Sequence, residues 1–197
     1  MTTLHFSKNS LLLFSFLLVA FLGFISCNNT TQNKKDSEEV AEDMNKPASD
    51  ATKESDERFL VRAAEINLEE VKLGQLAQQK AVNEDVKSLA KMMTDGHGKA
   101  MTDLSTLAAS KSIAVPAVPT NDVQDVYQRL SEKTGNDFDK EYCDRVVKGH
   151  KDAISLYENA TTGNNDPDVK AWANKILPDL RAHLQHAEMC EQKLKNM

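Results

Sequence analysis

The sequence predicts an all-α protein built as a four-helix bundle, and three observations support this prediction. Beyond an apolar N-terminal segment, four long stretches place apolar residues at intervals of three and four, the period of an amphipathic helix. Hydrophobicity does not alternate with a period of two over enough residues to make a strand. Outside the first 24 residues the chain has only six aromatic residues. Its core must therefore be mainly aliphatic, which suits closely packed helices.

The four predicted helices follow one another along the larger, C-terminal part of the chain. The first is expected over about 56–80, and the second over about 83–110, where inward positions step by four and three as in a heptad seam. The third is expected over about 136–160. Asp166 and Pro167 form a cap followed by a proline at the first helical position, so the fourth helix begins there.

The connections between these helices restrict the topology of the bundle. Short turns near 81–83 and 161–166 make each flanking pair an antiparallel hairpin. The link between the second and third helices is longer and contains a short extra helix, capped by Thr120 or Asn121 and ending at Gly135. Such a link can cross the bundle, so the second and third helices can run parallel, as in a ferritin-like arrangement; simple up-down-up-down order stays open.

The N-terminal segment has the features of an export signal. Lys8 supplies a positive charge before residues 11–25, an apolar run too short for a comfortable membrane span and typical of a secretory signal. The run leads into Ser26 and Cys27, which resemble a bacterial lipobox, in which the cysteine receives a lipid and becomes the new N-terminus. We expect a lipoprotein signal peptide over 1–26 and lipid attachment at Cys27. The alternatives are an uncleaved anchor and ordinary cleavage that leaves a free thiol.

The stretch between the lipid anchor and the bundle is polar. Residues 28–55 contain no aromatic residue and only Val40 and Met44 as larger apolar side chains, so they bury too little surface to offset their chain entropy. We expect 27–55 to be a disordered tether and 56–197 to be one domain with one core. A lipid anchor implies that the protein lies in the cell envelope and faces an oxidising space.

Four polar residues occupy core-facing positions near the middle of four different helices. They are Glu70 on the first helix, His97 on the second, His150 on the third and His183 on the fourth. A buried charge or imidazole is costly if unpaired, so these residues must satisfy one another, bind something or hold water. Three neutral imidazoles and one carboxylate suit a single zinc, copper or iron ion. A metal-free network of the glutamate and the histidines is the alternative.

Several function classes find no support in the sequence. The formal net charge of −6 gives no basic surface for nucleic acid. No Ser-His-Asp order, phosphate-binding loop or CxxC motif occurs. A ferritin-type di-iron centre needs a glutamate three residues before its histidines, where this chain has Thr94, Val147 and Leu180. Oxidase and iron-storage chemistry are therefore excluded.

Three glycines flank two of the histidines. Gly96 and Gly98 stand on either side of His97, and Gly149 precedes His150. Glycine inside a helix is less stable than alanine by roughly 0.5–1 kcal/mol, so these positions suggest that helices approach closely there, although chance is an alternative.

Cys143 and Cys190 are candidates for a disulfide. Each lies seven residues, or two helical turns, from the histidine of its own helix and on the same face. If His150 and His183 meet in an antiparallel pair, the two cysteines meet as well, and an oxidising compartment favours a bond between them. Two buried thiols are the alternative.

The spacing of residues along the whole domain resembles that of a known bacterial family. The matching positions are Phe59, Ala63, Ala64, the run 70–74, Met93, His97, Leu104, Leu107, Ala108, Gly135, Phe138, Asp139, Tyr142, His150, Leu177, Pro178, Leu180 and His183. The pattern is similar to the exported family known as domain of unknown function 4142. The resemblance implies a ferritin-like fold and an outer-membrane location facing the periplasm, and it implies no particular reaction.

The function expected from these features is that of a non-catalytic, membrane-tethered binding protein with one zinc, copper or iron ion in the bundle core. A first alternative is a metal-dependent enzyme that uses an open coordination position at the Glu70/His97/His150/His183 cluster. A second is a metal-free bundle with a structural role or one that binds a partner. The membrane, reached through the lipid on Cys27, is the expected partner, and nucleic acid is not.

Overall fold

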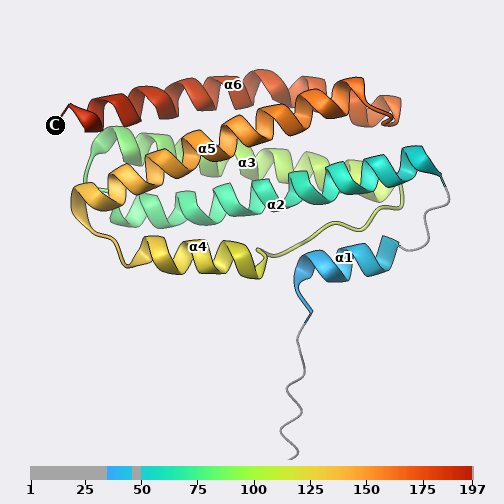
Figure 1. Ribbon diagram of the computed structural model, residues 1–197, viewed down its shortest axis with the longest axis horizontal. Coiled ribbons are helices and arrows are strands. Elements are labelled where there is room, and N and C mark those ends of the chain that lie inside the picture. The colour runs from blue at the N-terminus through green and yellow to red at the C-terminus, as the bar shows by residue number, and fades with distance from the viewer. Residues whose placement is uncertain (1–34, 46–49, 197) are drawn as a thin grey trace, which may run out of the picture. The chain divides into compact units, whose positions relative to one another are not determined.

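The computed structural model describes residues 35–45 and 50–196, and all the regular structure within these ranges is helical. The helices, in chain order, are α1 (Ser37–Asn45), α2 (Ala51–Lys80), α3 (Glu84–Ser110), α4 (Asn121–Ser131), α5 (Gly135–Thr162) and α6 (Pro167–Lys195). The four long helices α2, α3, α5 and α6 pack together as a helical bundle (Figure 1). The all-α prediction is confirmed for this part of the chain. None of these helices is long and apolar enough to span a lipid bilayer.

Side-chain caps explain where most of the helices begin. Asp50, Asn83 and Asp166 each accept a hydrogen bond from the backbone N–H two residues further on, which satisfies a donor that no helical carbonyl reaches. Thr120 caps α4 in a similar way, through the N–H three residues on. The predicted starts at Asn83 and Asp166 are confirmed, and of the two candidate caps of the short helix Thr120 is the one used. The predicted end of that helix at Gly135 is wrong, because α4 ends at Ser131 and Gly135 begins α5. The first long helix begins earlier than expected, at Ala51, because Asp50 provides a cap upstream.

The order of side-chain contacts shows in which direction each long helix runs. Asp103 pairs with Lys175, whereas Asp85, earlier in α3, pairs with Lys193, later in α6, so these two helices are antiparallel. The same reversed order of contacts relates α2 to α3, α2 to α5 and α5 to α6. Because α2 is antiparallel to both α3 and α5, the latter two run parallel. The link 111–134 therefore returns along the bundle, as Figure 1 shows.

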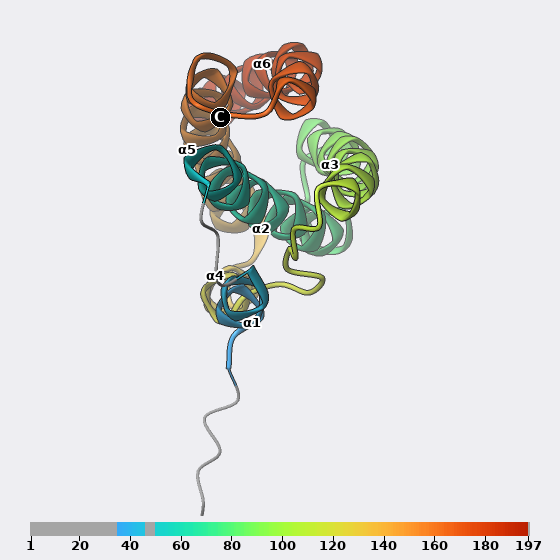
Figure 2. The ribbon, with the colours of Figure 1, turned by 90° about the vertical axis from the view of Figure 1, so that its right-hand side faces the viewer.

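The helix α1 lies in the stretch that was expected to be a disordered tether. Asn45 exchanges two hydrogen bonds with the backbone of Ala114, of 3.0 and 2.8 Å, and the Ser37 hydroxyl donates to the carbonyl of Val118. These polar contacts hold α1 against the crossover, on the side of α2 that faces away from α6 (Figure 2). The prediction of disorder is therefore wrong for α1 and for the first turn of α2. The predicted signal peptide and Cys27 lie outside the described residues.

A polar layer divides the core of the bundle into two apolar clusters. One cluster contains the contacting rings of Phe59, Tyr157 and Trp172, and the other contains the stacked rings of Phe138 and Tyr142. In each long helix, one cluster ends and the other begins at a buried polar residue. The residues of this layer are Asn67, Glu70, His97, His150 and His183.

Candidate metal centre

Three imidazoles from three helices meet in the polar layer. His97 Nε2 lies 3.2 Å from His150 Nε2, which in turn lies 3.4 Å from His183 Nδ1. One nitrogen from each ring lies within 4.8 Å of the other two, as in a site that can hold a metal ion. His97 and His150 are 2% and 1% exposed, and His183 is 8% exposed. The structure thus brings together three of the four residues that the sequence placed at one height in the bundle.

Hydrogen bonds on the far side of two rings determine which nitrogen carries the proton. His97 Nδ1 lies 2.9 Å from Asn67 Oδ1, and His150 Nδ1 lies 2.9 Å from the carbonyl oxygen of Val146. The amide of Asn67 is oriented because its Nδ2 donates to the carbonyl of Ala63. Both partners are therefore acceptors, and Nδ1 donates in each ring. The two Nε2 atoms consequently carry lone pairs that face each other at 3.2 Å.

Burial favours the neutral form of all three imidazoles. Desolvation, followed by the neighbouring His150 and His183, holds the pKa of His97 well below its ordinary value. Desolvation lowers the pKa of His150 to about 4, although the Val146 carbonyl acts in the opposite direction, and it also lowers the pKa of His183. Neutral imidazole is the form that binds metal ions, so the cluster is ready to act as a ligand set near neutral pH.

Glu70 contacts one of the three histidines, His150, on the side of that ring that faces away from the other two imidazoles. Its Oε1 is 3.5 Å from His150 Nδ1, the nitrogen that points away from the other two rings. Its Oε2 is buried and has no hydrogen-bond partner among the described residues. Burial raises the pKa of Glu70 well above its ordinary value, and Glu69 adds to this effect while Arg145 opposes it. These surroundings favour the uncharged acid.

The glycines that precede two histidines make room for side chains of other helices. A Cβ at Gly96 would lie 2.7 Å from His183 Cε1, and a Cβ at Gly149 would lie 3.1 Å from Glu70 Oε1. A Cβ at Gly98 would meet nothing within 4 Å. The close approach suggested by the sequence is therefore found at positions 96 and 149 and is absent at position 98.

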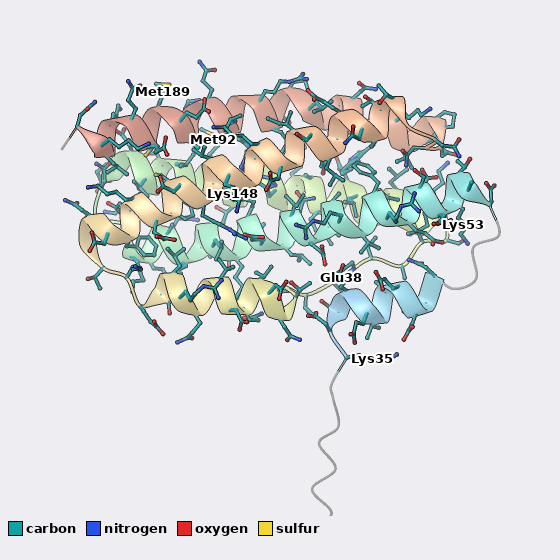
Figure 3. All side chains as sticks on the ribbon, in the orientation of Figure 1. Lys35, Glu38, Lys53, Met92, Lys148 and Met189 are labelled. Carbon is teal, nitrogen blue, oxygen red and sulfur yellow. The ribbon has the colours of Figure 1, made fainter. Side chains whose placement is uncertain are left out.

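Two hollows reach the polar layer from opposite faces of the bundle. A cavity of about 70 Å³ between α3 and α6 is lined in part by His97 and His183. A larger groove of about 440 Å³ between α2 and α5 is lined in part by Glu70 and by Lys148, which lies where α5 passes over α2 (Figure 3). The histidine cluster is thus approached from the α3–α6 side, and the carboxyl group of Glu70 from the α2–α5 side.

Cys143 and Cys190 lie two helical turns from the histidines of α5 and α6. Both are buried free thiols, and they lie close enough to influence each other's ionisation. The neighbouring Cys190, and then burial, raise the pKa of the Cys143 thiol. The two residues therefore meet, and their oxidation to a disulfide stays a prediction.

Comparison with known proteins identifies the family. The sequence profile described as "Domain of unknown function (DUF4142)" matches residues 41–190. The chain belongs to the DUF4142 family. This range contains every residue of the polar layer.

The comparisons beyond the family concern curated proteins and solved structures. No curated protein matches this DUF4142 chain. A solved structure, a DUF305 fragment from Deinococcus radiodurans, is similar with a TM-score of 0.61 and 13% identity, and covers 73% of this chain and 97% of its own. At that identity the likeness shows a shared helical fold alone.

Proposed function

We propose that this DUF4142 protein binds one transition-metal ion, zinc, copper or iron, at His97, His150 and His183, and acts as a non-catalytic binding protein. The observation that supports this most strongly is the contact between the two Nε2 atoms at 3.2 Å. Their protons are already committed to acceptors on the far side of each ring, so two lone pairs repel each other across this contact. A cation between them turns that repulsion into two coordinate bonds.

Two of the three separations between the imidazole nitrogens suit such an ion, and the third is within 4.8 Å. Zinc–nitrogen bonds of about 2.0–2.1 Å at tetrahedral angles place neighbouring ligand nitrogens about 3.3–3.4 Å apart. The separations of 3.2 Å between His97 and His150 and of 3.4 Å between His150 and His183 match this value closely. Three imidazoles are a donor set that zinc, copper and iron all accept.

Residues around the three histidines support the same function. Metal-binding histidines commonly donate their other N–H to a carbonyl or a carboxylate, which fixes the tautomer and the orientation of the ring. Here Asn67 Oδ1 accepts the Nδ1–H of His97, and the carbonyl oxygen of Val146 accepts the Nδ1–H of His150. Glu70 lies close enough to His150 Nδ1 to share that N–H with the carbonyl. We assign Glu70 to this supporting role.

The location of the protein in the cell and the topology of the bundle belong to the same proposal. The lipobox-like sequence at Cys27 supports a lipid-anchored protein of the cell envelope, in the outer membrane and facing the periplasm. Two antiparallel pairs, α2 with α3 and α5 with α6, joined by a crossover that leaves α3 and α5 parallel, support a ferritin-like arrangement.

Metal analysis of the full chain tests the proposal. The protein is extracted from membranes in detergent after growth with zinc, copper or iron, and its metal content is measured by mass spectrometry. We expect about one ion per chain. His97→Ala should lose the ion and keep its helical circular dichroism, whereas His186→Ala, on the exposed side of α6, should keep the ion. Wild-type protein without stoichiometric metal in all three conditions, or His97→Ala with full metal content, would refute the proposal.

A further inference from the structure

Three histidines leave at least one coordination position of the proposed ion without a protein ligand. Ions of this class take four or more ligands at nitrogen-rich sites, and an unfilled position distinguishes reactive sites from closed structural ones. Among the described residues, the ligand atoms that converge are one nitrogen each from His97, His150 and His183. Glu70 lies near the far nitrogen of His150, so its carboxyl group is not placed to fill the position.

The charge of the site determines what kind of ligand completes it. Three neutral imidazoles leave the full charge of a divalent ion uncompensated in a layer that is almost entirely buried. Even an ionised Glu70 beside His150 would balance only one unit of that charge. A small anion on the ion supplies both the missing ligand and the missing negative charge.

The cavity between α3 and α6 provides the space for this ligand. It touches His97 and His183, which carry two of the three donor atoms, and also Ala100. Its volume of about 70 Å³ is far below the roughly 300–1,000 Å³ of pockets for drug-sized molecules, so only a few small atoms fit. Of the three histidines, His183 is the most exposed.

Gly96 lines this cavity and leaves room for the His183 ring. Any side chain there would collide with the His183 ring, since a Cβ would lie 2.9 Å from its Nε2. The Nδ1 atom of the same ring faces His150, at 3.4 Å from that ring's Nε2. His183 thus presents Nδ1 to the ion, and its Nε2–H lies on the Gly96 side.

We propose that the metal ion at this centre binds a small anion of two or three heavy atoms, which reaches it through the cavity between α3 and α6. This inference rests on the proposed function, because it needs an ion at the three histidines. Two lysines, Lys99 and Lys175, and two aspartates, Asp103 and Asp179, line the same cavity, and their formal charges cancel. The ion itself therefore provides the attraction for the anion.

Azide binding to the copper-loaded full chain tests the inference. Copper content is measured first, and azide is then titrated while the ligand-to-metal charge-transfer band and the electron paramagnetic resonance spectrum are followed. We expect a saturable band with one azide per copper. Ala100→Leu and the milder Ala100→Met fill the cavity from its wall without altering a donor atom. Both should keep copper and weaken azide binding at least about tenfold.

Gly98→Ala is the matched control, because a Cβ there meets nothing within 4 Å, and its azide affinity should equal that of the wild type. A wild type that binds none of zinc, copper and iron would refute the proposed function, and with it the inference. Copper with no azide band would overturn the inference alone. Unchanged azide affinity in copper-loaded Ala100→Leu would also overturn it, because the anion would then not pass through this cavity.

Discussion

Replacing Gly96 by alanine adds one methyl group at the tightest contact of the polar layer. In the present geometry that carbon would lie 2.7 Å from His183 Cε1 and 2.9 Å from His183 Nε2. Carbon atoms in favourable contact are about 3.5–4.0 Å apart, so the imidazole must move by about 1 Å. The bundle backbone on both sides is packed into the two apolar clusters, and the ring yields more easily than the helices.

The size of the effect follows from what the ring does in the site. Its Nδ1 lies 3.4 Å from His150 Nε2, a separation that matches neighbouring ligands on one ion, and a 1 Å movement destroys this match. Disturbing only the hydrogen-bond partners of a metal ligand lowers affinity about 10–100-fold, so displacing the ligand itself should lower it by about 100-fold or more. The metal-free protein should change less. Overpacking destabilises by about 1–3 kcal/mol, and the gain in helix propensity offsets about 1 kcal/mol of this.

Two measurements separate these effects. Competition with a chelator of known affinity gives the metal dissociation constant, and denaturant unfolding of metal-stripped protein gives the free energy of unfolding. Gly98→Ala is the control on the same helix: it should keep metal affinity and gain roughly 0.5–1 kcal/mol of stability, because its Cβ points into open space. If Gly96→Ala bound the metal ion as tightly as the wild type does, the position of His183 would not matter for binding.

Three further predictions follow from the structure, and a fourth, on Cys27, follows from the sequence. Asn67→Leu removes the acceptor that orients His97 and should weaken metal binding about 10–100-fold in the same chelator competition; unchanged affinity contradicts the role of Asn67. Burial raises the pKa of Glu70 above its ordinary value of 4.5, so the unfolded chain loses this proton first as pH rises. The free energy of unfolding of the metal-stripped wild type should therefore fall relative to that of Glu70→Gln from about pH 4.5 upward. If the difference between the two proteins is the same at about pH 4 and pH 7, the pKa of Glu70 is not raised by folding. Cys27→Ser should leave the protein unprocessed or release it from the membrane fraction, and normal fractionation speaks against lipid attachment. Cys143 and Cys190 should resist alkylation in protein exported by cells with working oxidative folding; two modified thiols by intact mass would show that no disulfide forms.

The ends and faces of the long helices could be predicted because they depend on local sequence. Asp166 followed by Pro167 starts α6 whatever it packs against, since the cap satisfies donors two residues away. The 3.6-residue period likewise placed His97, His150 and His183 on inward faces. The helix α1 could not be predicted in this way. It is held by contacts such as that between Asn45 and Ala114, a polar side chain and a distant backbone, which leave no apolar period in the sequence.

The composition of the polar layer could be predicted more fully than its internal geometry. A helical period assigns a residue to a face, but the rotamer decides which ring nitrogen points where. Glu70 and His150 are therefore neighbours as expected, although the carboxyl group lies at Nδ1, away from the other rings. Asn67 lies one turn before Glu70 on the same inward side. The sequence indicates only a buried amide at this position, and nothing in it indicates that the amide pairs with His97.

The two apolar clusters explain how three histidines can converge without a metal ion to hold them. Each long helix contributes to both clusters, so its backbone is fixed on either side of the polar layer. Small zinc domains differ in this respect, because they lack such a core and fold only when the metal binds. Here an ion at the histidines should increase the free energy of unfolding with the logarithm of the ratio of the ion concentration to the dissociation constant. Removal of the ion should leave the helices in place. The fold therefore pre-forms the candidate ligand set, and the ion that we propose there would relieve the local repulsion between the Nε2 atoms of His97 and His150.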